Sequence, residues 1–265
     1  MSKLFYYSNG EGPPVLLVHG FYASHHYLSY VYERLEDHQV IVPDLLGFGG
    51  SPKPAHGDYS AESQSQLIKD VIEELKIDQP LTIVGHSMGG IISLFLAGSL
   101  RPEQVKTVII LNTPIYPNRQ AARDKLSDNN EDPEEVLYGR RARMAIESNI
   151  IVHPIVKAFS KRISKVWYRP YPVNAIADVT SCNWASYSGS LKGVMERQDE
   201  IHEFIEKMAD KIKMVSGSND PFRSLETEQA IVAKYPQIEW QELDAGHHTP
   251  VEIPEKIAEI IKSYL

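Results

Sequence analysis

Short, continuous runs of hydrophobic residues recur in the two terminal parts of the chain, and each run is followed by turn or helix signals. The runs cover residues 15–18, 40–42, 81–84, 105–111, 212–215 and 238–243. Runs of this length are typical of strands that a parallel sheet buries on both faces. Strand–helix alternation at both ends predicts an α/β fold with one doubly wound, mostly parallel sheet.

Segments with helical periodicity separate these runs. Leu28, Val31 and Leu35 are spaced for one helix, and residues 67–75 repeat the 3.6-residue period. Residues 87–100 are apolar almost all round, which predicts a buried helix that Pro102 ends. A last helix near the C-terminus begins around Pro254.

The middle of the chain breaks this alternation. Between residues 114 and 208 the pattern is helical, prolines are frequent and no convincing strand occurs. We therefore predict that residues 1–113 and 209–265 form two parts of one α/β core. Residues 114–208 are predicted to form a helical cap over the sheet.

The strongest chemical signal is the segment Gly85-His86-Ser87-Met88-Gly89, which follows a predicted strand and opens a predicted helix. A turn this tight needs small residues on both sides of the serine. It presents the hydroxyl at a helix N-terminus, where the dipole favours developing negative charge. Ser87 is therefore the candidate nucleophile.

Two further polar residues follow predicted strands. Asp220 comes after the run at 212–215, and a carboxylate there can orient an imidazole. His247 lies on the loop after the last strand and is the candidate general base, with His248 as the alternative. The oxyanion would need two N–H donors, for which we predict the backbone of Met88 and of Phe21, beside Gly20.

These motifs together resemble the α/β-hydrolase superfamily, in its serine-hydrolase branch of cap-bearing, esterase- and lipase-like members. The resemblance covers the chain to about residue 114 and roughly its last 55 residues. It rests on His19-Gly20-Phe21, on Asp44-Leu45-Leu46-Gly47-Phe48-Gly49-Gly50-Ser51, on the segment around Ser87 and on Gly246-His247. The order Ser, Asp, His along the chain belongs to this fold.

Two departures narrow the expected chemistry. Members similar to haloalkane dehalogenases and epoxide hydrolases have an aspartate nucleophile, whereas this chain has Ser87. Asn112 stands where some members place their acid, and an amide cannot stabilise an imidazolium as a carboxylate does. Asp220 therefore remains the candidate acid.

The resemblance implies hydrolysis of carboxylic esters through an acyl-enzyme, with activity falling below about pH 6–7 as the base becomes protonated. Alternatives with the same residues are hydrolysis of a carbon–carbon bond, a lactonase or a perhydrolase. Another class is a low-turnover ligand receptor or signalling protein of this fold. The cap decides among these, and its sequence identifies no subfamily.

Composition limits the partners and the cell compartment that we expect for this protein. A formal net charge of -8 argues against nucleic acid as a partner, and the single cysteine, Cys182, excludes an intrachain disulfide and is interpreted as structural. No run approaches the roughly 20 apolar residues that span a bilayer, and the N-terminus has no secretory pattern, so we expect a cytoplasmic protein.

We expect a small-molecule ester as partner and no cofactor. We also expect no metal, because nothing completes a ligand set around His25 and His26. The oligomeric state and the acyl-chain length stay open.

One stripe within residues 155–167 has two interpretations. Its apolar members are Ile155, Val156, Phe159, Ile163, Val166 and Trp167, interleaved with Lys157, Lys161, Arg162 and Lys165. We favour a cap helix whose apolar face covers the active site, and therefore expect no membrane contact. The alternative is a basic amphipathic helix on an anionic membrane. Trp167, Tyr168, Trp184 and Tyr187 are candidates either for the acyl pocket or for the core of the cap.

Overall fold

The sheet has seven strands. The computed structural model describes residues 3–127, 132–166 and 171–265, with backbone alone at 150 and 160–166. The strands are β1 (Tyr6–Asn9), β2 (Pro14–Val18), β3 (Gln39–Pro43), β4 (Leu81–His86), β5 (Val105–Leu111), β6 (Ile212–Gly217) and β7 (Glu239–Leu243). Their order is β1-β3-β2-β4-β5-β6-β7, and only the pairing of β1 with β3 is antiparallel. The predicted fold class is confirmed.

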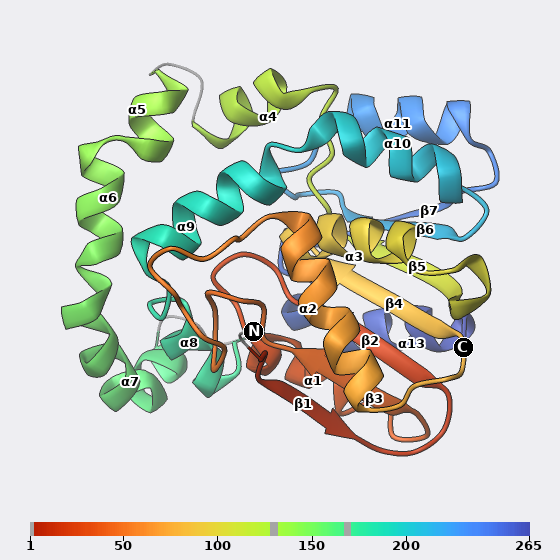
Figure 1. Cartoon of the computed structure of the whole chain (residues 1–265), viewed down its shortest axis with the longest axis horizontal. Helices are drawn as coiled ribbons and strands as arrows, with labels where there is room; N and C mark the ends of the chain where they lie inside the picture. Colours follow the sequence, from red (N-terminus) through yellow and green to blue (C-terminus); the bar gives the residue numbers. More distant parts are fainter. Residues whose placement is uncertain (1–2, 128–131, 167–170) are drawn as a thin grey trace.

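Helices cover both faces of the sheet (Figure 1). Helices α2 (Ala61–Glu74), α3 (Met88–Ser99), α10 (Gln198–Met208) and α11 (Leu225–Lys234) contribute to one core, and α1 (Ser29–Tyr32) and α13 (Pro254–Ser263) to the other. Successive strand residues point to opposite faces, so Leu16 joins the first core and Leu17 the second. Burial on both faces explains why the strands read as continuous hydrophobic runs.

Two features of the core differ from the sequence prediction. Strand β1 was not predicted, because this edge strand is half exposed and carries no hydrophobic run. Leu28, Val31 and Leu35 are all buried, but they do not share one helix. Instead, a 3₁₀ turn (His25–Leu28) leads into the four-residue α1, and Leu35 follows the turn at residues 33–34.

Between β5 and β6 the described residues form helices and no strand. These are α4 (Arg119–Leu126), α5 (Pro133–Tyr138), α6 (Arg140–Glu147), α7 (Asn149–Val166), α8 (Val173–Asp178), α9 (Trp184–Ser190) and a π-helical turn (Leu191–Met195). We call the segment from α4 to this turn the helical insertion. Its helices α5 to α8 lie at one end of the molecule (Figure 1). Helix α10 instead packs against α3, with Ile201 and Ile205 fully buried.

Candidate active site

Ser87 lies in the sharp turn between β4 and α3, at the centre of the sheet. Its backbone is left-handed, with φ 54° and ψ −125°, an unusual conformation for a residue with a side chain. The flanking glycines are required sterically: a Cβ on Gly85 would lie 2.4 Å from the Gly89 carbonyl oxygen, and one on Gly89 would lie 2.2 Å from that of Val18. The packing therefore holds the strained serine in place.

Hydrogen bonds join Ser87 to the two other predicted site residues. The Ser87 Oγ lies 3.0 Å from His247 Nε2, and His247 Nδ1 lies 2.8 Å from Asp220 Oδ2. All three residues are at least 90% buried. With Nδ1–H donated to the carboxylate, Nε2 is left to accept the serine proton. The structure thus brings together Ser87, His247 and Asp220 from three separate loops.

Asp220 is held in its ionised form by its neighbours. Burial alone would raise its pKa, but hydrogen bonds from His247, the Asn112 amide and the Phe222 N–H stabilise the carboxylate and lower the pKa below its ordinary value. Asn112 also donates to the Gly246 carbonyl and accepts from the Thr249 hydroxyl. Asn112, which cannot serve as the acid itself, therefore helps to position the Asp220 carboxylate.

The histidine loop is fixed at its backbone. Both carboxylate oxygens of Glu252 accept N–H groups, from Gly246 at 2.7 Å and from His248 at 3.0 Å. His86 Nε2 donates to the His247 carbonyl at 2.8 Å. His248, the alternative base, instead places its Nδ1 3.1 Å from the Tyr27 hydroxyl. A carboxylate five residues after His247 was the sequence signal for this support, and its role as a loop clamp was not predicted.

Gly20 lies directly against the nucleophile, since a Cβ there would come within 3.0 Å of the Ser87 Cβ. His19 braces this loop: its Nδ1 donates to the Gly20 carbonyl at 2.8 Å, and its Nε2 accepts the Leu45 N–H at 3.0 Å. Phe21, the next residue, lines the same pocket as Ser87, and Met88 is the first residue of α3.

The loop after β3 is built around Asp44, which is fully buried. One of its oxygens accepts the backbone and the ring N–H of His25, and the other accepts the Gly50 N–H. His26 bonds to Asp178 of α8 at 2.9 Å. These two histidines, considered for metal binding, are thus each engaged by a carboxylate. The described residues contain no group of three or more His, Cys, Asp and Glu side chains placed to hold a metal.

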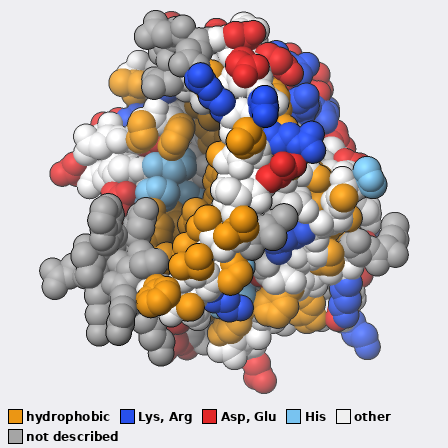
Figure 2. Space-filling model, turned by 90° about the vertical axis from the view of Figure 1, so that its left-hand side faces the viewer, with side chains coloured by type: hydrophobic (Ala, Val, Ile, Leu, Met, Phe, Trp, Pro, Cys, Tyr) orange, Lys and Arg blue, Asp and Glu red, His pale blue; other side chains and the backbone are white. Residues whose placement is uncertain are grey.

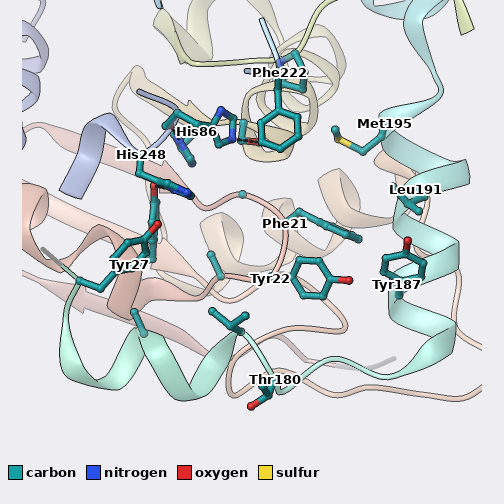
Figure 3. Close-up of a pocket in the computed structure, with 18 of the residues that line it drawn as sticks. Phe21, Tyr22, Tyr27, His86, Thr180, Tyr187, Leu191, Met195, Phe222 and His248 are labelled. Carbon is teal, nitrogen blue, oxygen red and sulfur yellow. Dashed lines mark hydrogen bonds between the residues drawn. The ribbon is translucent and has the colours of Figure 1, made fainter. Parts of the chain in front are cut away.

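A pocket of about 800 Å³ opens at Ser87. Figure 3 shows Tyr27, His86 and His248 along one side and Phe21, Tyr22, Tyr187 and Leu191 along the other. The second side is built partly by the helical insertion, which also contributes Leu126, Leu137 and Met195. Among the described lining residues there is no Lys, Arg, Asp or Glu. The pocket therefore suits an uncharged, largely apolar group.

The aromatic residues predicted for the acyl pocket or the cap core differ in where they lie. Tyr187 lines the pocket. Trp184 is not among the described lining residues, and its ring contacts that of Tyr187 with centroids 5.6 Å apart and planes tilted by 32°. Trp167 and Tyr168 lie outside the described residues. Cys182 is buried, and burial raises the pKa of its thiol to about 12, so it stays protonated and unreactive at neutral pH.

Comparison with known proteins decides the family. A family model described as alpha/beta hydrolase fold matches residues 13–145, which is half of the chain. The chain belongs to the α/β-hydrolase family. The predicted resemblance to this superfamily is confirmed, and the curated relatives of the chain include lipases.

Two of the curated relatives are each similar to about two fifths of the chain. Lipase 3 of a Moraxella species is 34% identical over 42% of this chain and 36% of its own length. A cis-3-alkyl-4-alkyloxetan-2-one decarboxylase of Shewanella oneidensis is 36% identical over 43% of this chain and 37% of its own length. The chain thus spans little more than a third of the length of these relatives. An esterase structure from Thermogutta terrifontis aligns over 98% of this chain and 92% of its own, with a TM-score of 0.66 and 23% identity, and supports the fold.

Proposed function

We propose that this α/β-hydrolase cleaves carboxylic esters through a covalent acyl-enzyme. The observation that carries the proposal is the hydrogen-bonded series from the Ser87 hydroxyl through His247 to Asp220, at 3.0 Å and 2.8 Å. In this role Ser87 is the nucleophile, His247 the general base and Asp220 the residue that orients and charge-stabilises the imidazole.

The reaction proceeds in two halves. The Ser87 Oγ bonds to the ester carbonyl carbon while its proton passes to His247 Nε2, and the N–H groups of Phe21 and Met88 receive the oxyanion. The carbon–oxygen bond to the alcohol then breaks, and His247 donates the proton to the departing alcohol. Water next attacks the acyl-enzyme while His247 takes its proton. The bond between the acyl carbon and the Ser87 Oγ then breaks, His247 returns the proton to Ser87, and the carboxylic acid is released.

The pocket supports an uncharged acyl group. Its lining from Phe21, Tyr22, Leu191 and Met195 offers apolar surface and no described cation for an anionic substrate. The helical insertion takes the role of a cap here, because it supplies much of this wall. A volume of about 800 Å³ accommodates a medium or long acyl chain with its alcohol.

The test is an assay on p-nitrophenyl esters from acetate to palmitate. Ser87→Ala should reduce kcat/KM by several orders of magnitude, to background hydrolysis. The matched control is Ser93→Ala in α3, the helix that follows Ser87, where the buried hydroxyl has no hydrogen-bond partner. This variant should retain activity.

Two results would contradict the proposal. Equal turnover by wild type and Ser87→Ala would exclude the serine mechanism. Absence of turnover, together with failure of a fluorophosphonate probe to label Ser87, would favour a ligand receptor. Labelling without ester turnover would keep the nucleophile and move the substrate to the lactone or carbon–carbon class.

A further inference from the structure

Hydrophobic side chains are exposed on one side of the helical insertion. Six of the nine large hydrophobic residues that are exposed in the described part of the chain lie between positions 144 and 179. Ile151 is 73% exposed, Met144 59% and Ile155 56%. We call this group the apolar face; its members are Met144, Ile151, Val152, Ile155, Phe159 and Val179. Figure 2 looks onto this side of the molecule and shows hydrophobic side chains gathered beside a hollow that contains histidine side chains.

Helix α7 has two different sides, which corrects one sequence expectation. Val156 lines the pocket and His153 bonds to the Ala177 carbonyl of α8, as expected of a helix covering the site. Ile151, Ile155 and Phe159, spaced by four residues, point outward instead. The expectation that the stripe covers the site is wrong for Ile155 and Phe159, because α7 meets the pocket along a narrow strip. Ile163, Val166 and Trp167 lie outside the described side chains.

The segment that carries most of the apolar face has a basic sequence, although the chain as a whole is acidic. Residues 140–165 contain seven of the 27 lysines and arginines but one of the 35 acidic residues, in a chain of net charge -8. Arg140, Arg141 and Arg143 on α6 and Lys157 on α7 are exposed. A basic, apolar helical surface on an acidic protein is the arrangement that binds anionic lipid.

We propose that the apolar face docks onto the surface of an anionic lipid bilayer, with its hydrophobic side chains in the interfacial layer and its basic residues at the headgroups. A symmetric contact between two copies would bring the same arginines face to face, which disfavours that occupant. No helix of the described chain is long and apolar enough to cross a membrane, so the contact is peripheral.

The position of the face adds a second argument. Val179 belongs both to the apolar face and to the pocket lining, so apolar surface continues from the outside into the pocket that opens at Ser87. An uncharged ester could pass from the bilayer to the nucleophile along this surface. Docking itself does not depend on the proposed function, because none of its residues takes part in acyl transfer.

The experiment is co-sedimentation of Ser87→Ala protein with phosphatidylcholine vesicles, with and without 30% phosphatidylserine. We expect binding that strengthens with phosphatidylserine and weakens with salt. We expect two double variants to weaken binding, each roughly tenfold or more. The first combines Ile151→Glu with Ile155→Glu, and the second combines Arg140→Glu with Arg141→Glu. Matched controls elsewhere are Leu225→Glu, a 45% exposed position on α11, and Lys256→Glu with Lys262→Glu on α13. These should bind as the parent does.

The same variants in the active background separate docking from folding and catalysis. Each should keep its thermal transition and its turnover of a water-soluble p-nitrophenyl ester. Three results would overturn the proposal: no binding to either vesicle, equal weakening in the controls, or equal binding to neutral and anionic vesicles. Concentration-dependent dimerisation that Ile151→Glu with Ile155→Glu abolishes, without vesicle binding, would assign the face to a second copy.

Discussion

The sheet core and the helical insertion differ in how completely they bury their side chains. Strand residues such as Leu16, Ile83 and Ile109 have no exposed surface, and every strand is hydrogen-bonded to its neighbours. Helix α6, by contrast, has no buried residue, and α7 exposes much of its apolar surface. The residues proposed for chemistry come from the core, and much of the pocket wall comes from the insertion. We therefore expect the sheet core to hold the reacting atoms and the more exposed helices to select the substrates that reach them.

The largest effect should come from the core. Asp220→Asn should lower kcat about 10³- to 10⁴-fold, because an amide fails to fix the His247 tautomer and to stabilise its charged form. The side chain is nearly isosteric, so KM and the thermal transition should change little. Steady-state kinetics on a p-nitrophenyl ester, with thermal unfolding of the same sample, measures both.

Asn219→Asp is the control for a charge change next to this position, because the Asn219 amide is exposed and contacts Asp244 on the surface. It should keep nearly full activity. A loss of less than about tenfold in Asp220→Asn would mean that the core does not use this carboxylate, and the division of labour between the two regions would fail.

Gly89→Ala should produce the largest loss of stability. The new methyl group would lie 2.2 Å from the Val18 carbonyl oxygen, and backbone there cannot move without shifting the sheet. We expect a loss of about 3 kcal/mol in the free energy of unfolding, or failure to fold. Gly50→Ala is the contrasting case, since its methyl group would meet the partly exposed ring of Phe5 at 3.1 Å. Similar urea midpoints for the two variants would contradict a rigid elbow.

Acidification should destabilise the core through its buried histidines. Burial lowers the pKa of His19, and it lowers the pKa of His86 well below its ordinary value. Below about pH 6.5 these two histidines therefore bind more protons in the unfolded chain than in the folded one. The free energy of unfolding is at its full value above about pH 6.5 and falls as the pH drops below it. Each such histidine contributes up to about 1.4 kcal/mol per pH unit.

Urea unfolding between pH 5 and 8 measures this slope. His86→Gln keeps a donor for the His247 carbonyl and removes one titrating group, so its slope should be shallower than that of the wild type. Parallel curves for wild type and His86→Gln would show that the ring binds protons equally in the folded and unfolded states, which would contradict a lowered pKa.

The core was predictable because its signals are local. A strand buried on both faces has to be hydrophobic throughout, and a serine in a strained turn has to stand between glycines. Strand β1 escaped prediction because its edge position removes that requirement. Residues that follow parallel strands are expected to meet, because the carboxyl ends of such strands lie at the same edge of the sheet. The structure brings Ser87, Asp220 and His247 together there.

The insertion was less predictable because periodicity says which residues share a helix face but not what that face meets. Val156 and Ile155 are neighbours of similar hydrophobicity, yet one lines the pocket and the other is exposed. The choice between His247 and His248 also depended on long-range contacts. Glu252 and His86 hold that loop by its backbone, which no pattern of residue types reveals.

The smallest effect should come from Glu196, which links the insertion to the pocket. Its side chain is 1% exposed and accepts hydrogen bonds from Arg119 of α4 and Tyr138 of α5. The same two helices supply Leu126 and Leu137 to the pocket wall. Glu196→Gln weakens these charged bonds, so the wall should loosen while Ser87 and its partners stay in place. We expect KM for long acyl esters to rise about fivefold with kcat within about twofold.

The control is Glu62→Gln, which breaks an exposed pair with Arg197 and should change neither constant. If kcat fell and KM did not, the insertion would act on the chemical step, and the distinction between a reacting core and a selecting insertion would have to be abandoned.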